Sequence, residues 1–105
     1  MHQQAERVVI GMDPHKRSAT IEVMTADETV IGGGRYATDE AGFADMAGYV
    51  TRIQPDRDRR VWAVEGCNGI GHHIAVRLLA TGEQVLDVPP KMSARTRVFA
   101  TGQGR

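Results

Sequence analysis

Alternating apolar and polar positions predict short β-strands in the first third of the chain. β-Branched residues open the segment 8–13, which ends at Asp13 because Pro14 cannot donate a hydrogen bond to a sheet. Residues 18–25 alternate apolar and polar side chains with the period of a half-buried strand. Residues 29–36 predict a third strand. Three short strands in succession favour an antiparallel meander.

A triplet of glycines interrupts the third predicted strand at residues 32–34. Glycine-rich loops that bind phosphate lead into a helix start and carry a lysine, and neither feature follows this triplet. We therefore interpret the triplet as a place of strand twist or a β-bulge, and not as a phosphate-binding loop.

A helix is predicted after the meander. Thr38 supplies a capping hydroxyl, and the two acids that follow it suit the first turn because they interact favourably with the helix dipole. The apolar residues at helical spacing are Phe43, Met46, Ala47, Val50 and Ile53. The helix should end near Gln54, because Pro55 cannot continue it. The mixed charges at 56–60 are interpreted as a solvated loop.

The remaining pattern predicts a strand, a helix and a strand. Residues 61–64 form a nearly continuous apolar run, typical of a strand covered on both faces, and Glu65 follows them. Asn68 predicts the cap of a second helix that closes at Gly82. Residues 84–88 predict a fifth strand. The predicted fold class is α/β, with a mixed sheet and the element order β-β-β-α-β-α-β.

The length of 105 residues suits one domain with a single core. We expect residues 1–88 to form the folded part and residues 89–105 to form a basic segment. No apolar run approaches the roughly 20 residues that span a bilayer, and the polar N-terminus lacks the apolar core of a secretory signal. Cys67 is the lone cysteine, so no intrachain disulfide can form. These features predict a cytoplasmic protein without a membrane partner.

The formal net charge is zero, but the charges are unevenly distributed. All thirteen acids precede residue 89, so every charged residue of the segment 89–105 is basic. Its bases are Lys91, Arg95, Arg97 and Arg105. This asymmetry makes the segment a candidate nucleic-acid-binding arm that contacts phosphates, with a solvated polar tail as the alternative.

Two acids, Asp13 and Glu65, end predicted strands. The predicted element order is that of the ribonuclease-H-like fold, in which the first and fourth strands lie side by side, so both acids would project to one site. Two carboxylates with water are usual ligands of Mg²⁺, with Mn²⁺ as the alternative ion, and such metals catalyse phosphodiester chemistry. Either acid alone is more often structural, as a helix cap or an arginine partner. Their joint placement favours a catalytic metal site.

Other polar residues are weaker candidates. His15 and Lys16 follow the first acid and could contact a phosphate of nucleic acid, or serve solubility alone. His72 and His73 cannot both face one site, because adjacent helical positions diverge by about 100°. They also lack a zinc-type spacing to Cys67, which we interpret as a small buried thiol and not as a nucleophile.

Three segments carry a family resemblance. They are Gly-Met-Asp-Pro-His-Lys at 11–16, Val-Glu-Gly at 64–66, and the stretch 88–105, which contains Val-Pro-Pro-Lys-Met-Ser-Ala-Arg and Thr-Gly-Gln-Gly-Arg. Together they resemble the N-terminal domain of the DEDD transposases of insertion-sequence family one-hundred-ten, and related site-specific DNA invertases look similar. Pro14 departs from the small or β-branched residue usual there, which should stiffen the turn without removing the carboxylate.

The resemblance implies a RuvC-like domain whose Asp-Glu-Asp-Asp acids bind Mg²⁺, with Asp13 as the first acid and Glu65 as the second. The other two acids of this family usually follow a Gly-x-Gly-Arg segment, here 102–105. We therefore expect a truncated domain that holds half of the metal set and is inactive alone. The larger transposase would also carry a C-terminal domain with a nucleophilic serine.

The activity implied by the resemblance is DNA strand cleavage and transfer during insertion-sequence transposition, at the nucleoid in the bacterial cytoplasm. The implied partners are DNA, a guide (bridge) RNA in the full-length protein, and further copies of the protein in a homo-oligomer. Two alternatives stay open. One is half of a sugar-kinase or actin-like ATPase, although Pro14 and His15 do not supply the amide and hydroxyl that cradle phosphate in such proteins. The other is a non-enzymatic nucleic-acid-binding module.

Overall fold

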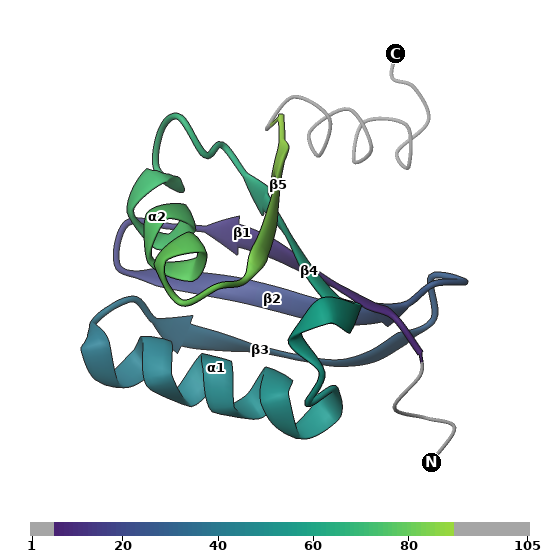
Figure 1. Cartoon of the computed structure of the whole chain (residues 1–105). Helices are drawn as coiled ribbons and strands as arrows, with labels where there is room; N and C mark the ends of the chain where they lie inside the picture. Colours follow the sequence, from purple (N-terminus) through teal and green to yellow (C-terminus); the bar gives the residue numbers. More distant parts are fainter. Residues whose placement is uncertain (1–5, 90–105) are drawn as a thin grey trace.

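The computed structural model describes residues 6–89, which form one α/β unit. Along the chain the elements are β1 (Val8–Pro14), β2 (Ser18–Thr25), β3 (Val30–Ala37), α1 (Glu40–Ile53), the 3-10 helix η2 (Arg57–Arg59), β4 (Arg60–Glu65), α2 (His72–Ala80) and β5 (Gln84–Val88) (Figure 1). The predicted α/β class, with a mixed sheet of five strands and two α-helices, is confirmed. The predicted bounds of β2 and β5 agree with the structure.

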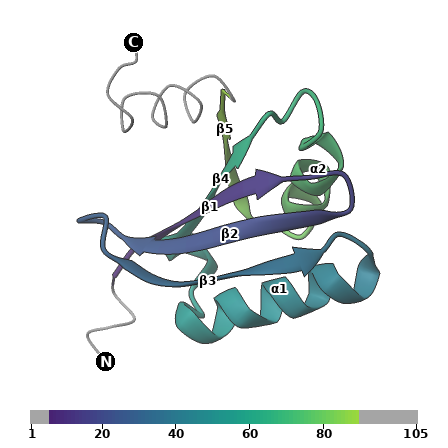
Figure 2. The same cartoon turned by 180° about the vertical axis from the view of Figure 1, so that it is seen from behind.

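β1 is the central strand of the sheet, whose strand order is β3-β2-β1-β4-β5. The hairpins β1–β2 and β2–β3 are antiparallel, whereas β4 runs parallel to both β1 and β5. Figure 2 shows the same arrangement from behind, with β1 between β2 and β4. The carboxyl ends of β1, β4 and β5 therefore lie at the same edge of the sheet.

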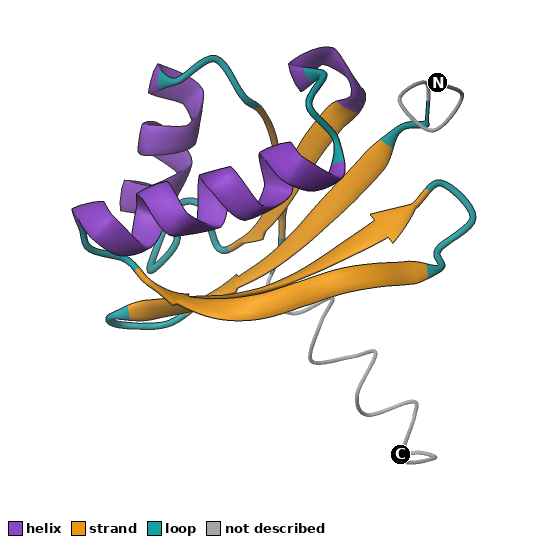
Figure 3. Cartoon of the chain, turned by 90° about the horizontal axis from the view of Figure 1, so that it is seen from below, coloured by secondary structure: helices purple, strands orange, loops and turns teal. Residues whose placement is uncertain are grey.

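Both α-helices lie on one side of the sheet (Figure 3). Alternate residues of each strand point toward them, because successive side chains of a strand face opposite ways. The largest fully buried apolar side chains of this core are Ile10, Ile21, Val23, Met46, Val50, Trp62, Val64 and Leu78. We call the opposite side the open face, because no described element covers it.

The open face corrects one prediction. The apolar run 61–64 indicated a strand covered on both faces, but Val61 and Ala63 lie on the open face and are only half-buried. Trp62 and Val64 alone face the helices, with 1% and 0% of their surface exposed. The run is continuous in sequence because Val61 and Ala63 are apolar, although no described element covers the open face.

β1 extends one residue further than the sequence indicated, because Pro14 belongs to the strand and pairs with Ala19. The ladder between β1 and β4 already ends at Met12 and Val64. Only β2 therefore flanks Pro14, and the missing N–H of the proline removes no bond to β4. His15 then closes the hairpin by donating its backbone N–H to the carbonyl of Ser18 at 2.7 Å.

The glycine triplet belongs to β3, and all three glycines pair with β2 in regular register. The register shift lies directly before the triplet, because Val23 pairs with Gly32 whereas Met24 pairs with Val30. The glycines also allow α1 to approach the sheet, because a Cβ atom on Gly32 would overlap the hydroxyl of Tyr49. That hydroxyl accepts a hydrogen bond of 2.9 Å from the backbone N–H of Gly33.

Both helix caps differ from the predicted ones. The cap of α1 is Asp39 and not Thr38, since the carboxylate of Asp39 accepts a hydrogen bond of 2.8 Å from the N–H of Gly42. Helix α2 begins after Gly71 without a side-chain cap, so Asn68 does not cap it. A Cβ atom on Gly71 would lie 2.6 Å from the carbonyl oxygen of Glu65, so packing between the turn and β4 sets where α2 starts.

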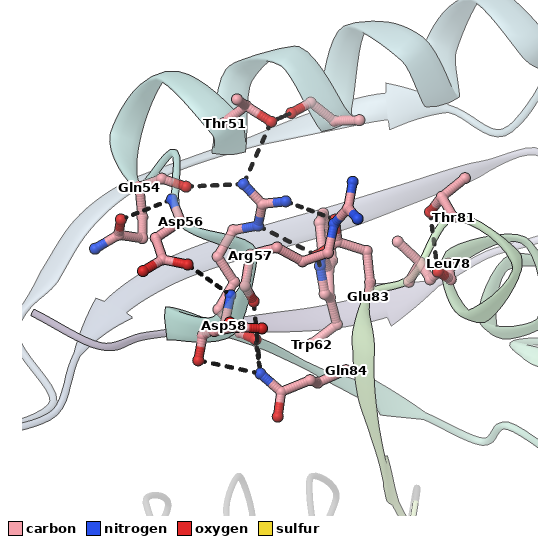
Figure 4. A network of polar contacts seen from close by, with 12 residues as sticks. Thr51, Gln54, Asp56, Arg57, Asp58, Trp62, Leu78, Thr81, Glu83 and Gln84 are labelled. Atoms are coloured by element: carbon pink, nitrogen blue, oxygen red, sulfur yellow. Dashed lines mark hydrogen bonds and ion pairs between the residues drawn. The ribbon is translucent and has the colours of Figure 1, made fainter. Parts of the chain in front are cut away.

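The charge run 56–60 is not simply a solvated loop. Arg60 begins β4 with 4% of its surface exposed, and its Nη2 atom lies 2.6 Å from Oε2 of Glu83. Figure 4 shows Glu83 in the middle of a polar network, where it also accepts a hydrogen bond of 2.8 Å from the indole of Trp62. The carbonyl of Gln54 accepts from Arg60 at 2.8 Å. This network ties α1, β4 and the start of β5 together.

None of the helices in residues 6–89 is long and apolar enough to span a lipid bilayer.

Candidate functional site

Asp13 and Glu65 lie at equivalent ends of two neighbouring parallel strands. The ladder between β1 and β4 pairs Met12 with Val64, and each acid is the next residue on its strand. Both side chains point to the open face, because the residues before them face the helices. The strands lie about 4.8 Å apart in a sheet, so the two carboxylates are close enough to share one ligand.

The two acids line a cleft of about 580 Å³ on the open face, which we call the acidic cleft. Its floor is formed by Gly11 and Ala63, which are partners in the ladder between β1 and β4. Glycine has no side chain and alanine has only a methyl group, so neither residue fills the space on the open face next to the two carboxylates. The small floor residues therefore create the cleft, and the acids stand at its end.

Glu22 is a third carboxylate of the acidic cleft, which the sequence interpretation missed. It is the β2 partner of Gly11 and is exposed on the open face, two pairs along the ladder from the pairing of Asp13 with Thr20. The sequence did contain a signal for this position. The alternation of residues 18–25 places Glu22 on the face of the strand that does not carry the apolar side chains. Within residues 6–89, however, no group of three His, Cys, Asp or Glu side chains lies close enough together to hold a metal ion.

Within residues 6–89, neither acid shows the structural role that was the alternative to a metal site. Within the described part of the chain, Asp13 and Glu65 form no ion pair with Lys or Arg, and neither caps a helix. The side chain of Asp13 contacts His15, at 3.7 Å between Oδ2 and Nε2, and both side chains are about half exposed, at 49% and 44%. Two solvent-accessible carboxylates fit the preference of Mg²⁺ for carboxylate and water ligands.

Two of the six residues predicted to contact nucleic acid lie at this edge of the sheet. His15 and Lys16 lie in the exposed turn between β1 and β2, beside Asp13. The other four predicted contacts fall outside the described residues; they are Lys91, Arg95, Arg97 and Arg105.

Cys67 follows the carboxyl end of β4 in the chain, and its side chain is half-buried. Burial raises the pKa of its thiol, and the charge of Asp87 and a hydrogen bond with that carboxylate raise it further. The thiol is therefore protonated at neutral pH, which makes it a poor nucleophile. Asp87 also accepts a hydrogen bond of 3.1 Å from the backbone N–H of Cys67, so it holds this turn in place.

His72 and His73 start helix α2, with ring centroids 6.1 Å apart in an edge-on arrangement. Both are exposed, and only His73 faces the space between α2 and the turn of residues 15–16.

Two comparisons with known proteins give no match. No protein-family model matches this chain, and no curated protein sequence matches it significantly. Membership of the transposase family stays a hypothesis based on the motifs at 11–16, 64–66 and 88–105.

Proposed function

We propose that this chain is the N-terminal part of a ribonuclease-H-like, RuvC-like catalytic domain of a DEDD-type DNA transposase or recombinase. Asp13 and Glu65 are two of the acids that hold Mg²⁺ for DNA strand cleavage and transfer in insertion-sequence transposition. The other acids of the set lie outside residues 6–89. In this proposal the described unit is a ligand-bearing half of the catalytic centre.

The observation that carries the proposal is the joint position of Asp13 and Glu65 in one cleft, at the ends of adjacent parallel strands. Carboxylates placed in this way repel each other unless a cation lies between them. The described chain supplies no Lys or Arg to either carboxylate. A divalent cation is the simplest partner for the pair. The sheet order, with β1 between β2 and β4, further supports the fold family.

The residues of the acidic cleft have separate tasks in the proposed reaction. Asp13 and Glu65 would each donate carboxylate oxygens to Mg²⁺. The ion would activate the attacking oxygen and stabilise the leaving oxygen. Gly11 and Ala63 leave room for the phosphodiester of the substrate strand beside the two acids.

Recombination by the full-length protein tests this proposal. Asp13→Asn and Glu65→Gln each remove a charged ligand with little change in shape, so each is expected to abolish Mg²⁺-dependent strand transfer. Glu22→Gln is the matched control, because it removes a charge from the same cleft without removing a proposed ligand. Normal recombination by both ligand variants, with unchanged thermal unfolding, would contradict the proposal.

One observation favours a second candidate, a non-enzymatic nucleic-acid-binding module. Within residues 6–89 only two of the expected ligands converge, and no group of three suits a metal. In that case DNA binding would not depend on Mg²⁺, and the variants at Asp13 and Glu65 would leave it unchanged. Measurement of DNA binding with Mg²⁺ and with a chelator separates the two candidates.

A further inference from the structure

A second cleft, of about 300 Å³, lies on the helix side of the sheet near the same edge. The turn after β1, the link between β3 and α1, and one side of α2 form its walls. Its polar lining residues are His15, Lys16, Thr38, His73 and Arg77, and the rest of the lining is apolar. We call it the basic cleft, because four of these five residues are Lys, Arg or His and no acid lines it.

Arg77 is held in place at one wall of the basic cleft. Its guanidinium carbon lies 4.3 Å from the centre of the Phe43 ring, a cation–π geometry that fixes the plane of the group. Its Nη1 atom donates a hydrogen bond of 3.0 Å to the carbonyl of Thr38. A guanidinium carries five N–H donors, so most of the donors of Arg77 have no partner within the described residues. The group is positioned and still able to bind a ligand.

No ion pair within residues 6–89 neutralises the charges of Arg77 and Lys16. Arg77 is half-buried whereas Lys16 and His73 are exposed, so a firmly held guanidinium shares a small space with an exposed ammonium group and an exposed imidazole. Such a combination suits a compact anion with several acceptor oxygens.

We propose that the basic cleft binds a phosphate group, with Arg77 as the principal donor and Lys16 and His73 as supporting contacts. For the source of that phosphate, the inference rests on the proposed function: the group belongs to the backbone of the DNA strand that also passes the acidic cleft. His15 connects the two clefts, because it lines the basic cleft while its Nε2 atom lies 3.7 Å from Asp13. The strand would cross the edge of the sheet at this histidine.

Titration of the 105-residue chain with inorganic phosphate, in a phosphate-free buffer with a chelator, tests the site without any metal. Nuclear magnetic resonance should show saturable shifts at Ile70, Ile74 and the side chain of Arg77. Loss of a hydrogen bond to a charged group corresponds to about tenfold or more in affinity, which is the weakening expected for Arg77→Gln. Since Arg77 also packs on Phe43, the exposed Lys16→Gln gives an independent test.

Arg52→Gln is the matched control for these variants. Arg52 is exposed in the last turn of α1 and does not line the basic cleft, so the variant removes one positive charge elsewhere. It should bind phosphate like the unmodified chain. The proposal is overturned by an absence of saturable shifts at the cleft, or by equal affinities in Lys16→Gln, Arg77→Gln and Arg52→Gln.

A labelled single-stranded oligonucleotide in the same metal-free buffer identifies the source of the phosphate. If the ligand is a DNA backbone, Lys16→Gln should weaken binding and lower the slope of log affinity against log salt by about one. Phosphate shifts without any effect of Lys16→Gln on DNA binding would confirm the cleft and assign it to a small phosphate compound. Asp13→Asn should leave the phosphate shifts intact, so failure of the metal site is distinguishable from failure of this cleft.

Discussion

The Nε2 atom of His15, which lines the basic cleft, lies 3.7 Å from the Oδ2 atom of Asp13, which lines the acidic cleft. The histidine contacts one carboxylate that lines the acidic cleft, and it lines the basic cleft together with Lys16 and Arg77. A divalent cation at Asp13 would compete with this contact, because both require the same carboxylate. The pairing therefore connects occupation of the acidic cleft to the position of a side chain in the basic cleft.

Glu83 should make stability depend on pH in the acid range. Burial acts to raise its pKa, but hydrogen bonds from Arg60 and Trp62 and the charges of Arg60 and Arg57 outweigh burial and hold the pKa below the ordinary 4.5. The stabilisation is therefore complete above pH 4.5 and is lost as the pH falls through the lower pKa of the folded state. Chemical denaturation at pH 7 and at lower pH measures this loss.

Glu83→Gln should lower the free energy of unfolding at pH 7 by about 3 kcal/mol, because it leaves the buried Arg60 without its counter-charge. It should also flatten the acid dependence. Glu22→Gln, on the open face, should change stability by less than about 0.5 kcal/mol. An unchanged acid dependence in Glu83→Gln would show that another carboxylate is responsible.

Two glycines of helix α1 should respond to alanine in opposite directions. A Cβ atom on Gly42 would overlap the backbone carbonyl of Ala37, so Gly42→Ala should cost about 1–3 kcal/mol in unfolding free energy. Gly48 has open space, with its nearest contact 3.9 Å away at the end of the Arg52 side chain. Gly48→Ala should stabilise the chain by about 0.5–1 kcal/mol, through helix propensity.

Thermal or urea unfolding of both glycine variants provides the measurement. If Gly42→Ala were as stable as Gly48→Ala, the close approach of α1 to the end of β3 would be wrong.

Cys67 should react slowly with alkylating reagents. Burial and the neighbouring Asp87 raise the pKa of its thiol above the ordinary 9.0, so little thiolate is present at pH 8. Asp87→Asn removes the charge but keeps an oxygen that can accept from the N–H of Cys67. The variant should therefore react severalfold faster with iodoacetamide at pH 8, with the rate followed by mass spectrometry. Equal rates would mean that Asp87 does not control the thiol.

Sequence patterns predicted those elements whose residues carry a local signal. The alternation at 18–25 and the proline after residue 88 gave the bounds of β2 and β5. Glu65 was placed at the end of β4, and Asp13 lies one residue before the end of β1. These predictions needed only the periods of strands and helices and the properties of proline. They succeeded because neighbours along the chain determine them.

Errors arose where contacts distant in sequence decide the structure. The charge run 56–60 indicated a loop, but Arg60 pairs with Glu83, a partner 23 residues away. Helix α2 starts after Gly71 because that glycine packs on the backbone of Glu65, which no pattern around Asn68 reveals. Neither contact can be predicted from the residues that are adjacent in sequence.

The clefts were predictable only in part. The alternation of β2 placed Glu22 on the same face as Asp13, but the pairing of Gly11 with Ala63 that makes the acidic cleft hollow depends on the register between β1 and β4. The basic cleft joins residues from three separate segments, so Arg77 could not be assigned to it from sequence.

The central claim is that Asp13 and Glu65 share a divalent cation. The most direct measurement is titration of the isotope-labelled chain with Mn²⁺, whose paramagnetism broadens the resonances of nearby nuclei.

The account predicts broadening centred on the amides of Asp13, Thr20 and Glu65. The double variant Asp13→Asn, Glu65→Gln should lose it, whereas Asp56→Asn, which changes an exposed acid at the other end of β4, should retain it. Broadening that is centred elsewhere, or that survives in the double variant, would contradict the account.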